Sequence, residues 1–231
     1  MGHRLSEWTG HGPMLEQDIA ISNMALDLIG QARNFYQYAA QLIGNTTEDN
    51  LAFLRNGREY KNLLITELPN GDWAMTIGKL FFFSAYKYCL FEQLSSCSNA
   101  QLAAIAEKSL KEVTYHRRWS SEWVIRLGDG TEESKSRMQS AITELWPFTG
   151  EMFRLSEYEA DVYKHIASLN VRKLKDSWSS FTGSVLAEAL ITVDKAAWMQ
   201  EGGKRGIHTE HLGLLLAEMQ YMQRTYPGCE W

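Results

Sequence analysis

Apolar residues recur every three or four positions along most of the chain, and no run of strand length alternates β-branched residues with polar ones. This spacing is typical of amphipathic helices that bury one face. The four prolines stand where a helical pattern stops or starts. We therefore predict an all-α protein. The predicted helices span residues 14–44, 48–68, 71–96, 99–128, 131–153, 156–169, 171–201 and 207–225.

Local signals mark several of the predicted helix ends. Gly44 closes the first long helix, and Thr46 or Thr47 is placed to cap the next one. Asp72 is a good N-cap, and Thr131 follows a glycine-rich helix stop and precedes two acidic residues. The first residues resemble the end of a helix, so we expect that a preceding helix is missing.

Composition narrows the class of protein. A chain of 231 residues with 45% apolar content favours one domain over residues 1–231. Its formal charge of −5 argues against a nucleic-acid partner. Three cysteines without a CxxC pair fit a reducing cytoplasm. The most apolar run, at residues 80–83, is too short to span a bilayer, so we expect no membrane partner.

Seven motifs stand in a fixed order along the chain. They are Arg4–His11, Leu26–Arg33, Leu64–Gly71, Lys111–His116, Arg126–Thr131, Gly202–Gly213 and Ala217–Tyr221. Together they resemble the structural C subunits (PaaC type) of the multicomponent ring-1,2-phenylacetyl-CoA epoxidases, in the ferritin-like superfamily. The resemblance runs from Arg4 to Trp231 and is weakest over residues 154–200.

The resemblance implies a ferritin-like four-helix bundle with additional helices and a non-catalytic, structural role in phenylacetate degradation. It implies a homologous A subunit that carries the di-iron centre and the phenylacetyl-CoA site, and a bridging B subunit. A reductase with flavin and iron–sulfur groups passes electrons from NADPH. The complex inserts one oxygen atom of O₂ into the aromatic ring, and this chain itself holds no cofactor.

A di-iron bundle needs a Glu-x-x-His pair on two helices and a carboxylate on each of the other two. Nowhere in this chain does a Glu stand three residues before a His. The resemblance places these residues at the six ligand positions: Glu7, Leu28, Gln31, Ser84, Val113 and His116. Leucine and valine have no donor atoms, so we predict a degenerate, metal-free site. Glu7, Gln31 and His116 either form a hydrogen-bond cluster or point to solvent or a partner.

Two metal alternatives stay open at this point. His208, Glu210, His211 and Glu218 have a spacing that suits zinc. A stand-alone metal enzyme would instead use Glu7 and His116 with acids such as Asp27. For the segment before the last helix we favour contact with the A subunit over a metal or a phosphate cradle. The residues assigned to that contact are Lys204, Arg205, His208, Glu210 and His211.

The resemblance also assigns ligand contacts. Cations and aromatic faces suit the phosphates and adenine of CoA. The residues concerned are Glu59, Tyr60, Lys61 and Asn62, with Ala160, Asp161 and Val162 as a second segment. A solvated helix face is the alternative for the first segment, and a free-standing acyl-CoA-binding oligomer is the alternative for the chain. Trp119, Trp123, Tyr221 and Trp231 are candidate interface aromatics.

Overall fold

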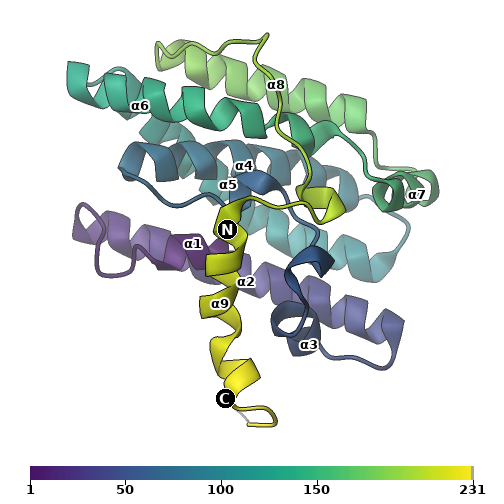
Figure 1. Ribbon diagram of the computed structural model, residues 1–231. Helices are drawn as coiled ribbons and strands as arrows, with labels where there is room; N and C mark the ends of the chain where they lie inside the picture. The colour runs from purple at the N-terminus through teal and green to yellow at the C-terminus, as the bar shows by residue number, and fades with distance from the viewer. Residues whose placement is uncertain (230–231) are drawn as a thin grey trace. The chain divides into compact units, whose positions relative to one another are not determined.

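The computed structural model describes residues 1–229, and all regular elements in that range are helices, with no β-strand (Figure 1). The all-α prediction is therefore confirmed. The chain forms two compact units, one of Met1–Pro69 with the residues from Gly202 onward, and one of Asn70–Glu201. We predicted one domain for residues 1–231, and whether the units fold as one stays a prediction.

The first unit is built around one long helix. Its elements are α1 (Gly2–Ser6), α2 (Leu15–Ile43), α3 (Glu48–Phe53), 3₁₀ turns at Gly57–Glu59, Leu64–Thr66 and Gly203–Arg205, and α9 (Glu210–Thr225). Helix α2 packs against α1 and α3, and α9 packs against α3 and the Gly57–Glu59 turn.

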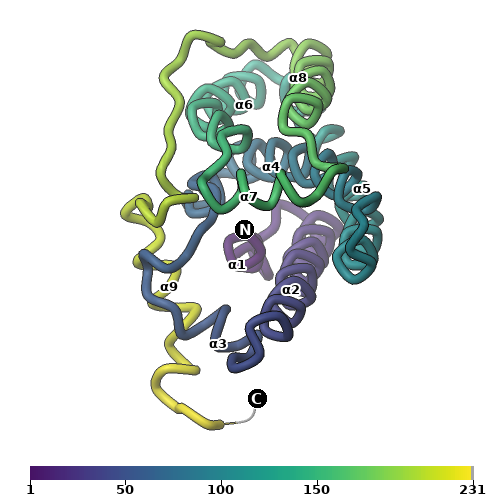
Figure 2. The backbone as a smooth tube through the Cα atoms, turned by 90° about the vertical axis from the view of Figure 1, so that its right-hand side faces the viewer, coloured from purple at the N-terminus to yellow at the C-terminus, as the bar shows by residue number. Residues whose placement is uncertain are grey.

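The second unit is a helical layer structure centred on α4. Its elements are α4 (Trp73–Leu94), α5 (Ala100–Gly128), α6 (Glu132–Leu145), 3₁₀ turns at Trp146–Phe148 and Gly150–Phe153, α7 (Glu157–His165) and α8 (Val171–Glu188). Helix α4 packs against α5, α6 and α8, and Figures 1 and 2 show α6 and α8 on the same side of it. Because neighbours surround α4, it is apolar on most faces, and Ile77, Leu80 and Phe81 are fully buried.

The predicted helix ends depend on local chemistry, and most are confirmed. Gly44 adopts a left-handed conformation at the end of α2. Thr47, Asp72 and Thr131 each accept a hydrogen bond from a backbone N–H in the first turn of the helix they precede. No helix among the described residues is long and apolar enough to cross a membrane.

Three predicted helices are too long. The helix predicted at 48–68 ends at Phe53, because the residues that follow leave the helix and hydrogen-bond to the segment before α9. The helix predicted at 131–153 becomes 3₁₀ after Leu145, where Pro147 follows. The helix predicted at 171–201 ends at Glu188. The segment beyond it is held instead by hydrogen bonds between the Gln139 side chain and the Thr192 backbone.

Candidate functional site

Two segments far apart in the sequence meet in the first unit. They are residues 54–69 and residues 202–209, which lead into α9. The Asn62 backbone N–H donates to the Gly203 carbonyl oxygen at 3.3 Å. Glycine is required here, since a Cβ at Gly203 would lie 2.2 Å from the Asn62 carbonyl oxygen. The sequence had assigned the first segment to ligand contact and the second to a partner protein, and the structure brings them together.

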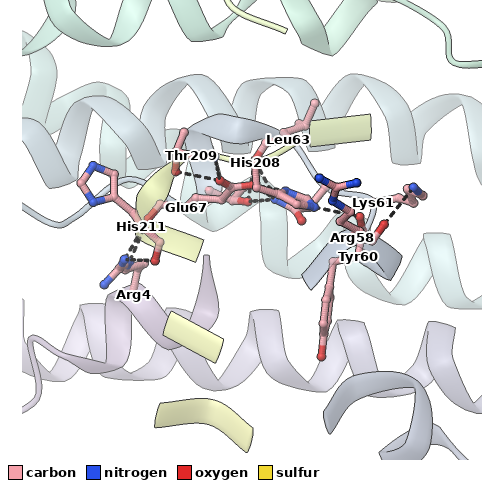
Figure 3. A network of polar contacts seen from close by, with 11 residues as sticks. Arg4, Arg58, Tyr60, Lys61, Leu63, Glu67, His208, Thr209 and His211 are labelled. Atoms are coloured by element: carbon pink, nitrogen blue, oxygen red, sulfur yellow. Dashed lines mark hydrogen bonds and ion pairs between the residues drawn. The ribbon is translucent and has the colours of Figure 1, made fainter. Parts of the chain in front are cut away.

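The Glu67 carboxylate joins the two segments (Figure 3). Its side chain is 1% exposed. Oε1 accepts from the Asn62 side-chain amide at 2.7 Å and lies 2.7 Å from Nδ1 of His208. Oε2 accepts from the backbone N–H and the hydroxyl of Thr209, both at 2.8 Å. Four contacts therefore compensate the loss of water around this carboxylate.

Both ring nitrogens of His208 are engaged. Nε2 lies 3.1 Å from the Tyr60 carbonyl oxygen, and since a carbonyl only accepts, Nε2 is the donor of that contact. Nδ1 lies 2.7 Å from Oε1 of Glu67. The two contacts hold the imidazole ring between the Glu67 carboxylate and the Tyr60 backbone, so that neither buried polar group lacks a partner.

Arg4 of α1 hydrogen-bonds to the backbone at Glu67 and in α9. Its guanidinium donates to the Glu67 carbonyl oxygen at 2.9 and 3.1 Å and to the Glu7 carboxylate at 2.8 Å. A longer contact, 3.5 Å, reaches the His211 carbonyl oxygen in α9. Sequence reasoning named neither Arg4 nor Glu67 as a site residue. The available signal was a lone acidic residue within the apolar run Leu63–Leu68.

Tyr60 connects the segment of residues 54–69 to α3 and α9. Its ring packs with Leu212 and Leu216 of α9. Its hydroxyl donates to the Ala52 carbonyl oxygen at 2.6 Å and accepts from the Gln220 amide at 2.7 Å. Burial raises the pKa of the Tyr60 hydroxyl, and the Gln220 hydrogen bond opposes part of that rise. The Tyr60 side chain therefore holds this segment in place through the packing of its ring and the hydrogen bonds of its hydroxyl.

The other predicted ligand-contacting residues differ in accessibility. The Glu59 carboxylate accepts from the Asn56 backbone N–H, and the Asn62 amide is engaged with Glu67. The exposed Lys61 ammonium donates to the Arg58 carbonyl oxygen at 3.1 Å. Of the four residues Glu59–Asn62, Glu59 and Lys61 are exposed, and Lys61 is the one that carries a positive charge.

The second predicted ligand-contacting segment lies in the other unit. Ala160, Asp161 and Val162 belong to α7, and Asp161 forms an exposed ion pair with Lys164 at 2.9 Å. Contact of both segments with one ligand stays a prediction.

A groove of about 620 Å³ lies beside the Glu67 network within the first unit. Its basic residues are Arg58 and Arg205, both exposed, and Leu212 and Leu216 form an apolar wall. Gly206 is left-handed, and a Cβ there would lie 2.3 Å from the Arg58 carbonyl oxygen. The groove therefore combines two guanidinium groups with an apolar side, which suits an anionic ligand or side chain.

The residues assigned to contact with the A subunit are unequally accessible. Arg205 and Glu210 are exposed and His211 is half-buried, whereas Lys204 is buried. Of the two neighbouring cations of this segment, one is therefore turned inward and the other outward. Among the interface aromatics, Trp119 and Trp123 pack edge to face on Trp73, and Tyr221 is exposed. Trp231 lies outside the described residues.

The geometry does not favour zinc at the last helix. Both ring nitrogens of His208 are engaged with Glu67 and Tyr60, whereas a histidine ligand needs a nitrogen lone pair for the metal. Within residues 1–229, no group of three or more His, Cys, Asp or Glu side chains is placed to hold a metal ion.

The residues at the six positions that the resemblance assigns to di-iron ligands do not supply the ligand set that two iron ions require. Leu28 and Val113 are buried hydrocarbons. The Ser84 hydroxyl lies 3.2 Å from the Ser120 hydroxyl and donates to the Phe81 carbonyl oxygen. Glu7 is exposed and pairs with Arg4. These residues do not fit a carboxylate-bridged pair of irons.

Two polar side chains remain buried at those positions, Gln31 in the first unit and His116 in the second. Because Glu7 is turned to the surface, it is accessible to solvent or a partner. A hydrogen-bond cluster of Glu7, Gln31 and His116 stays a prediction.

Comparison with known proteins agrees with the motifs. The family model PaaA_PaaC, described as phenylacetic acid catabolic protein, matches residues 1–231. The chain is also 46% identical over 231 residues to the C subunit of the 1,2-phenylacetyl-CoA epoxidase of Escherichia coli (strain K12), covering 100% of this chain and 93% of that relative. The chain belongs to the phenylacetic acid catabolic protein family.

Proposed function

We propose that this chain is a non-catalytic structural subunit of a phenylacetyl-CoA epoxidase. The observation that carries the proposal is the 46% identity to the C subunit of such an epoxidase along the whole chain. Similarity of that extent covers both compact units and all seven motifs, rather than a single shared segment.

The chemistry of the inner positions supports a structural role. Leu28 and Val113 supply no ligand atoms, and Glu7 forms an ion pair with Arg4 at the surface. A carboxylate-bridged metal centre would have to be held by another chain. We call that chain the catalytic-type subunit and assign it the di-iron centre and the main substrate site.

The remaining components follow from the same proposal. A small B-type subunit bridges the assembly, and a reductase with flavin and iron–sulfur groups supplies electrons from NADPH. The complex works in the cytoplasm and inserts one oxygen atom of O₂ into the ring of phenylacetyl-CoA. This chain contributes stability to the catalytic-type subunit and part of the surface around the substrate.

Its own ligand contacts would come from the basic side of the groove. Arg58 and Arg205 line the groove and are exposed, and the exposed Lys61 ammonium donates to the Arg58 carbonyl oxygen. Guanidinium and ammonium groups are suited to the phosphates of CoA. Glu59, Tyr60 and Asn62 would then act by holding the backbone of this segment. Ala160–Val162 is proposed as a second, weaker contact. Arg205, Glu210 and His211 are proposed to face a partner subunit.

The test is reconstitution. The catalytic-type subunit is expressed alone and together with this chain, and both preparations are assayed for assembly by size exclusion and for epoxidation of phenylacetyl-CoA with the reductase. We expect a stable complex and ring epoxidation only when this chain is present. Full activity of the catalytic-type subunit by itself, or no association between the two chains, would overturn the proposal.

A further inference from the structure

The groove beside the Glu67 network is lined by two arginines that start from adjacent points of the backbone. Arg58 and Arg205 both line it, and both are exposed. Gly206, the neighbour of Arg205, approaches Arg58 so closely that an added Cβ would lie 2.3 Å from the Arg58 carbonyl oxygen. The two side chains therefore leave the backbone side by side, although the arginines stand far apart in the sequence.

Lys61 adds a third cation at the edge of this groove. Its ammonium donates to the Arg58 carbonyl oxygen at 3.1 Å (Figure 3). It also lies beside Gly206, where an added Cβ would come within 2.7 Å of Nζ. Both residues that the ammonium touches line the groove. Three positive charges thus gather around one glycine, in a chain whose formal charge is −5.

The nearby carboxylates do not balance these charges. The Glu59 carboxylate accepts from the Asn56 backbone N–H, and the buried Glu67 carboxylate has four polar contacts of its own. In the part of the chain that the structure describes, neither Arg58 nor Lys61 forms an ion pair. Exposed cations that gather without a carboxylate repel one another and attract an anion.

The remaining wall of the groove indicates which part of a ligand it can recognise. His208 and Thr209 line the groove, but their side chains are already bonded to the Glu67 carboxylate. Ile207 also lines it, is 65% exposed and supplies apolar surface. The cations are therefore the groups best placed to select a ligand, and apolar contact with the body of the ligand adds little directional preference.

Phosphate is the anion that suits this arrangement best. Guanidinium groups bind phosphate oxygens through pairs of parallel hydrogen bonds, and an ammonium adds a point charge. A phosphate monoester carries about 1.5–2 negative charges near neutral pH, so it balances more of a triple positive charge than one carboxylate does. The groove volume of about 620 Å³ leaves room for a body attached to the phosphate.

We infer that Arg58, Lys61 and Arg205 form a phosphate-binding site that is complete within this chain and does not recognise the acyl part of its ligand. The inference deepens the proposed function and rests on it for the identity of the ligand. The phosphate comes either from the nucleotide end of CoA or from a free phosphorylated molecule. All three residues belong to the first unit, so binding requires no catalytic-type subunit.

The first test is a calorimetric titration of the isolated chain with adenosine 3′,5′-bisphosphate, a fragment of the nucleotide end of CoA. We expect Arg58→Gln to weaken binding about 10-fold or more. The control is Arg172→Gln, which removes an exposed arginine of α8 in the other unit. It should change the affinity less than about twofold, because a distant exposed charge is screened.

Both substitutions change exposed side chains, so both variants should melt within about 1 °C of the unaltered chain. A loss of binding by Arg58→Gln at an unchanged melting temperature is then a loss of the site and not of the fold. Failure of the unaltered chain to bind the bisphosphate would overturn the inference. So would equal affinities of Arg58→Gln and the unaltered chain.

Competition by AMP, inorganic phosphate and adenosine distinguishes the two sources of the phosphate. Binding of the bisphosphate about 10-fold or more tightly than AMP would support the site and assign it to the nucleotide end of CoA. Similar affinities for the bisphosphate, AMP and inorganic phosphate would support the site and assign it to a free phosphate. Adenosine has no phosphate, and if it competed as well as AMP, phosphate recognition would be overturned.

Comparison of CoA with phenylacetyl-CoA tests whether the acyl part is recognised. We expect their affinities for the isolated chain to agree within about twofold, because the two ligands carry the same phosphates. Binding of phenylacetyl-CoA about 10-fold or more tightly than CoA would show that this chain recognises the acyl group, and would overturn that part of the inference.

The outcomes separate this inference from the proposed function. The titrations use the isolated chain, whereas the proposed function is tested by reconstitution with the catalytic-type subunit. Assembly and epoxidation in the reconstitution, together with no phosphate binding by the isolated chain, would overturn the inference alone. Phosphate binding by the isolated chain without any assembly would overturn the proposed function and would support the site.

Discussion

Nδ1 of His208 lies 2.7 Å from Oε1 of Glu67, although the two residues stand 141 positions apart in the sequence. The contact closes the first unit by tying the start of α9 to the segment before α4. The Glu67 side chain is 1% exposed and has polar contacts with both segments that line the groove. We therefore expect the loss of these contacts to displace both segments.

Glu67→Gln should therefore destabilise the protein strongly. The amide keeps the size of the side chain, but it replaces one of the two carboxylate oxygens by an NH₂ group that then faces a donor. We expect a loss of about 2–4 kcal/mol in the free energy of unfolding, measured with urea. Glu210→Gln, which alters an exposed carboxylate of α9, is the control and should change stability by less than about 0.5 kcal/mol. Similar stabilities of the two variants would contradict this account of Glu67.

Tyr60→Phe tests the hydroxyl that joins α3 to α9. The ring still packs on Leu212 and Leu216, but the Ala52 carbonyl oxygen loses its donor and Gln220 loses an acceptor. We expect a cost of about 1–2 kcal/mol and faster hydrogen exchange of the α9 amides. Tyr221→Phe, at an exposed position of the same helix, should leave both quantities nearly unchanged.

Gly206→Ala and Gly44→Ala separate backbone strain from crowding. Both glycines are left-handed, with φ of 79° and 84°. A Cβ at Gly44 meets nothing, whereas one at Gly206 meets the Arg58 carbonyl oxygen. Gly44→Ala should cost about 1 kcal/mol, and Gly206→Ala clearly more. Equal losses in urea unfolding would show that the two segments do not approach each other as described.

The shifted pKa of Lys87 in α4 should make the free energy of unfolding depend on pH. Burial lowers the pKa of its ammonium group to about 7, with the Glu112 carboxylate opposing part of the shift. Its ammonium lies 4.9 Å from the centre of the Phe91 ring. The unfolded chain binds this proton up to its ordinary pKa of about 10.4, so the lysine destabilises the fold most below pH 7. That penalty is relieved as the pH rises from 7 toward 10.

Lys87→Met should accordingly be more stable than the unaltered protein at pH 6. Its advantage should shrink above pH 7, by at most about 1.4 kcal/mol per pH unit. The comparison is made by urea unfolding of both proteins at each pH, so that other titrating groups cancel. An advantage that does not vary between pH 6 and pH 9 would show that the proton is not displaced in this range.

Lys61→Ala tests the proposed ligand contact in the assembled complex. If the ammonium binds a CoA phosphate, the KM for phenylacetyl-CoA should rise about 5- to 20-fold with little change in kcat, because a remote contact contributes to binding rather than to the chemical step. Lys108→Ala, at an exposed position of α5, is the control. An unchanged KM for Lys61→Ala would remove this residue from the ligand site.

Local chemistry explains which parts of the fold could be predicted. Gly44, Thr47 and Asp72 determine helix ends through hydrogen bonds within a few residues, and these ends were predicted correctly. The segment after Phe53 has helical spacing as well, but its backbone and side chains bond to α9 and to the segment before it. Tertiary contacts therefore replace the expected helix, and the local sequence pattern does not predict these contacts.

The site, like the fold, could be predicted only in part from the sequence. The basic character of residues 58–61 and 204–205 is visible in the sequence, but their adjacency depends on Glu67 and on the glycines at 203 and 206. A buried carboxylate whose polar partners stand 141 and 142 positions away leaves no periodic signal. The resemblance assigned Leu28 and Val113 to ligand positions, and neither hydrocarbon side chain has a donor atom for iron. That the chain holds no metal stays a prediction.

The iron content of the chain, alone and with the catalytic-type subunit, tests the central claim most directly. Each preparation is purified and its iron and zinc are measured by elemental analysis against protein concentration. The structural-subunit account predicts less than about 0.1 metal ion per isolated chain and about two irons per pair. Stoichiometric iron or zinc in the isolated chain, retained after chelation, would contradict it.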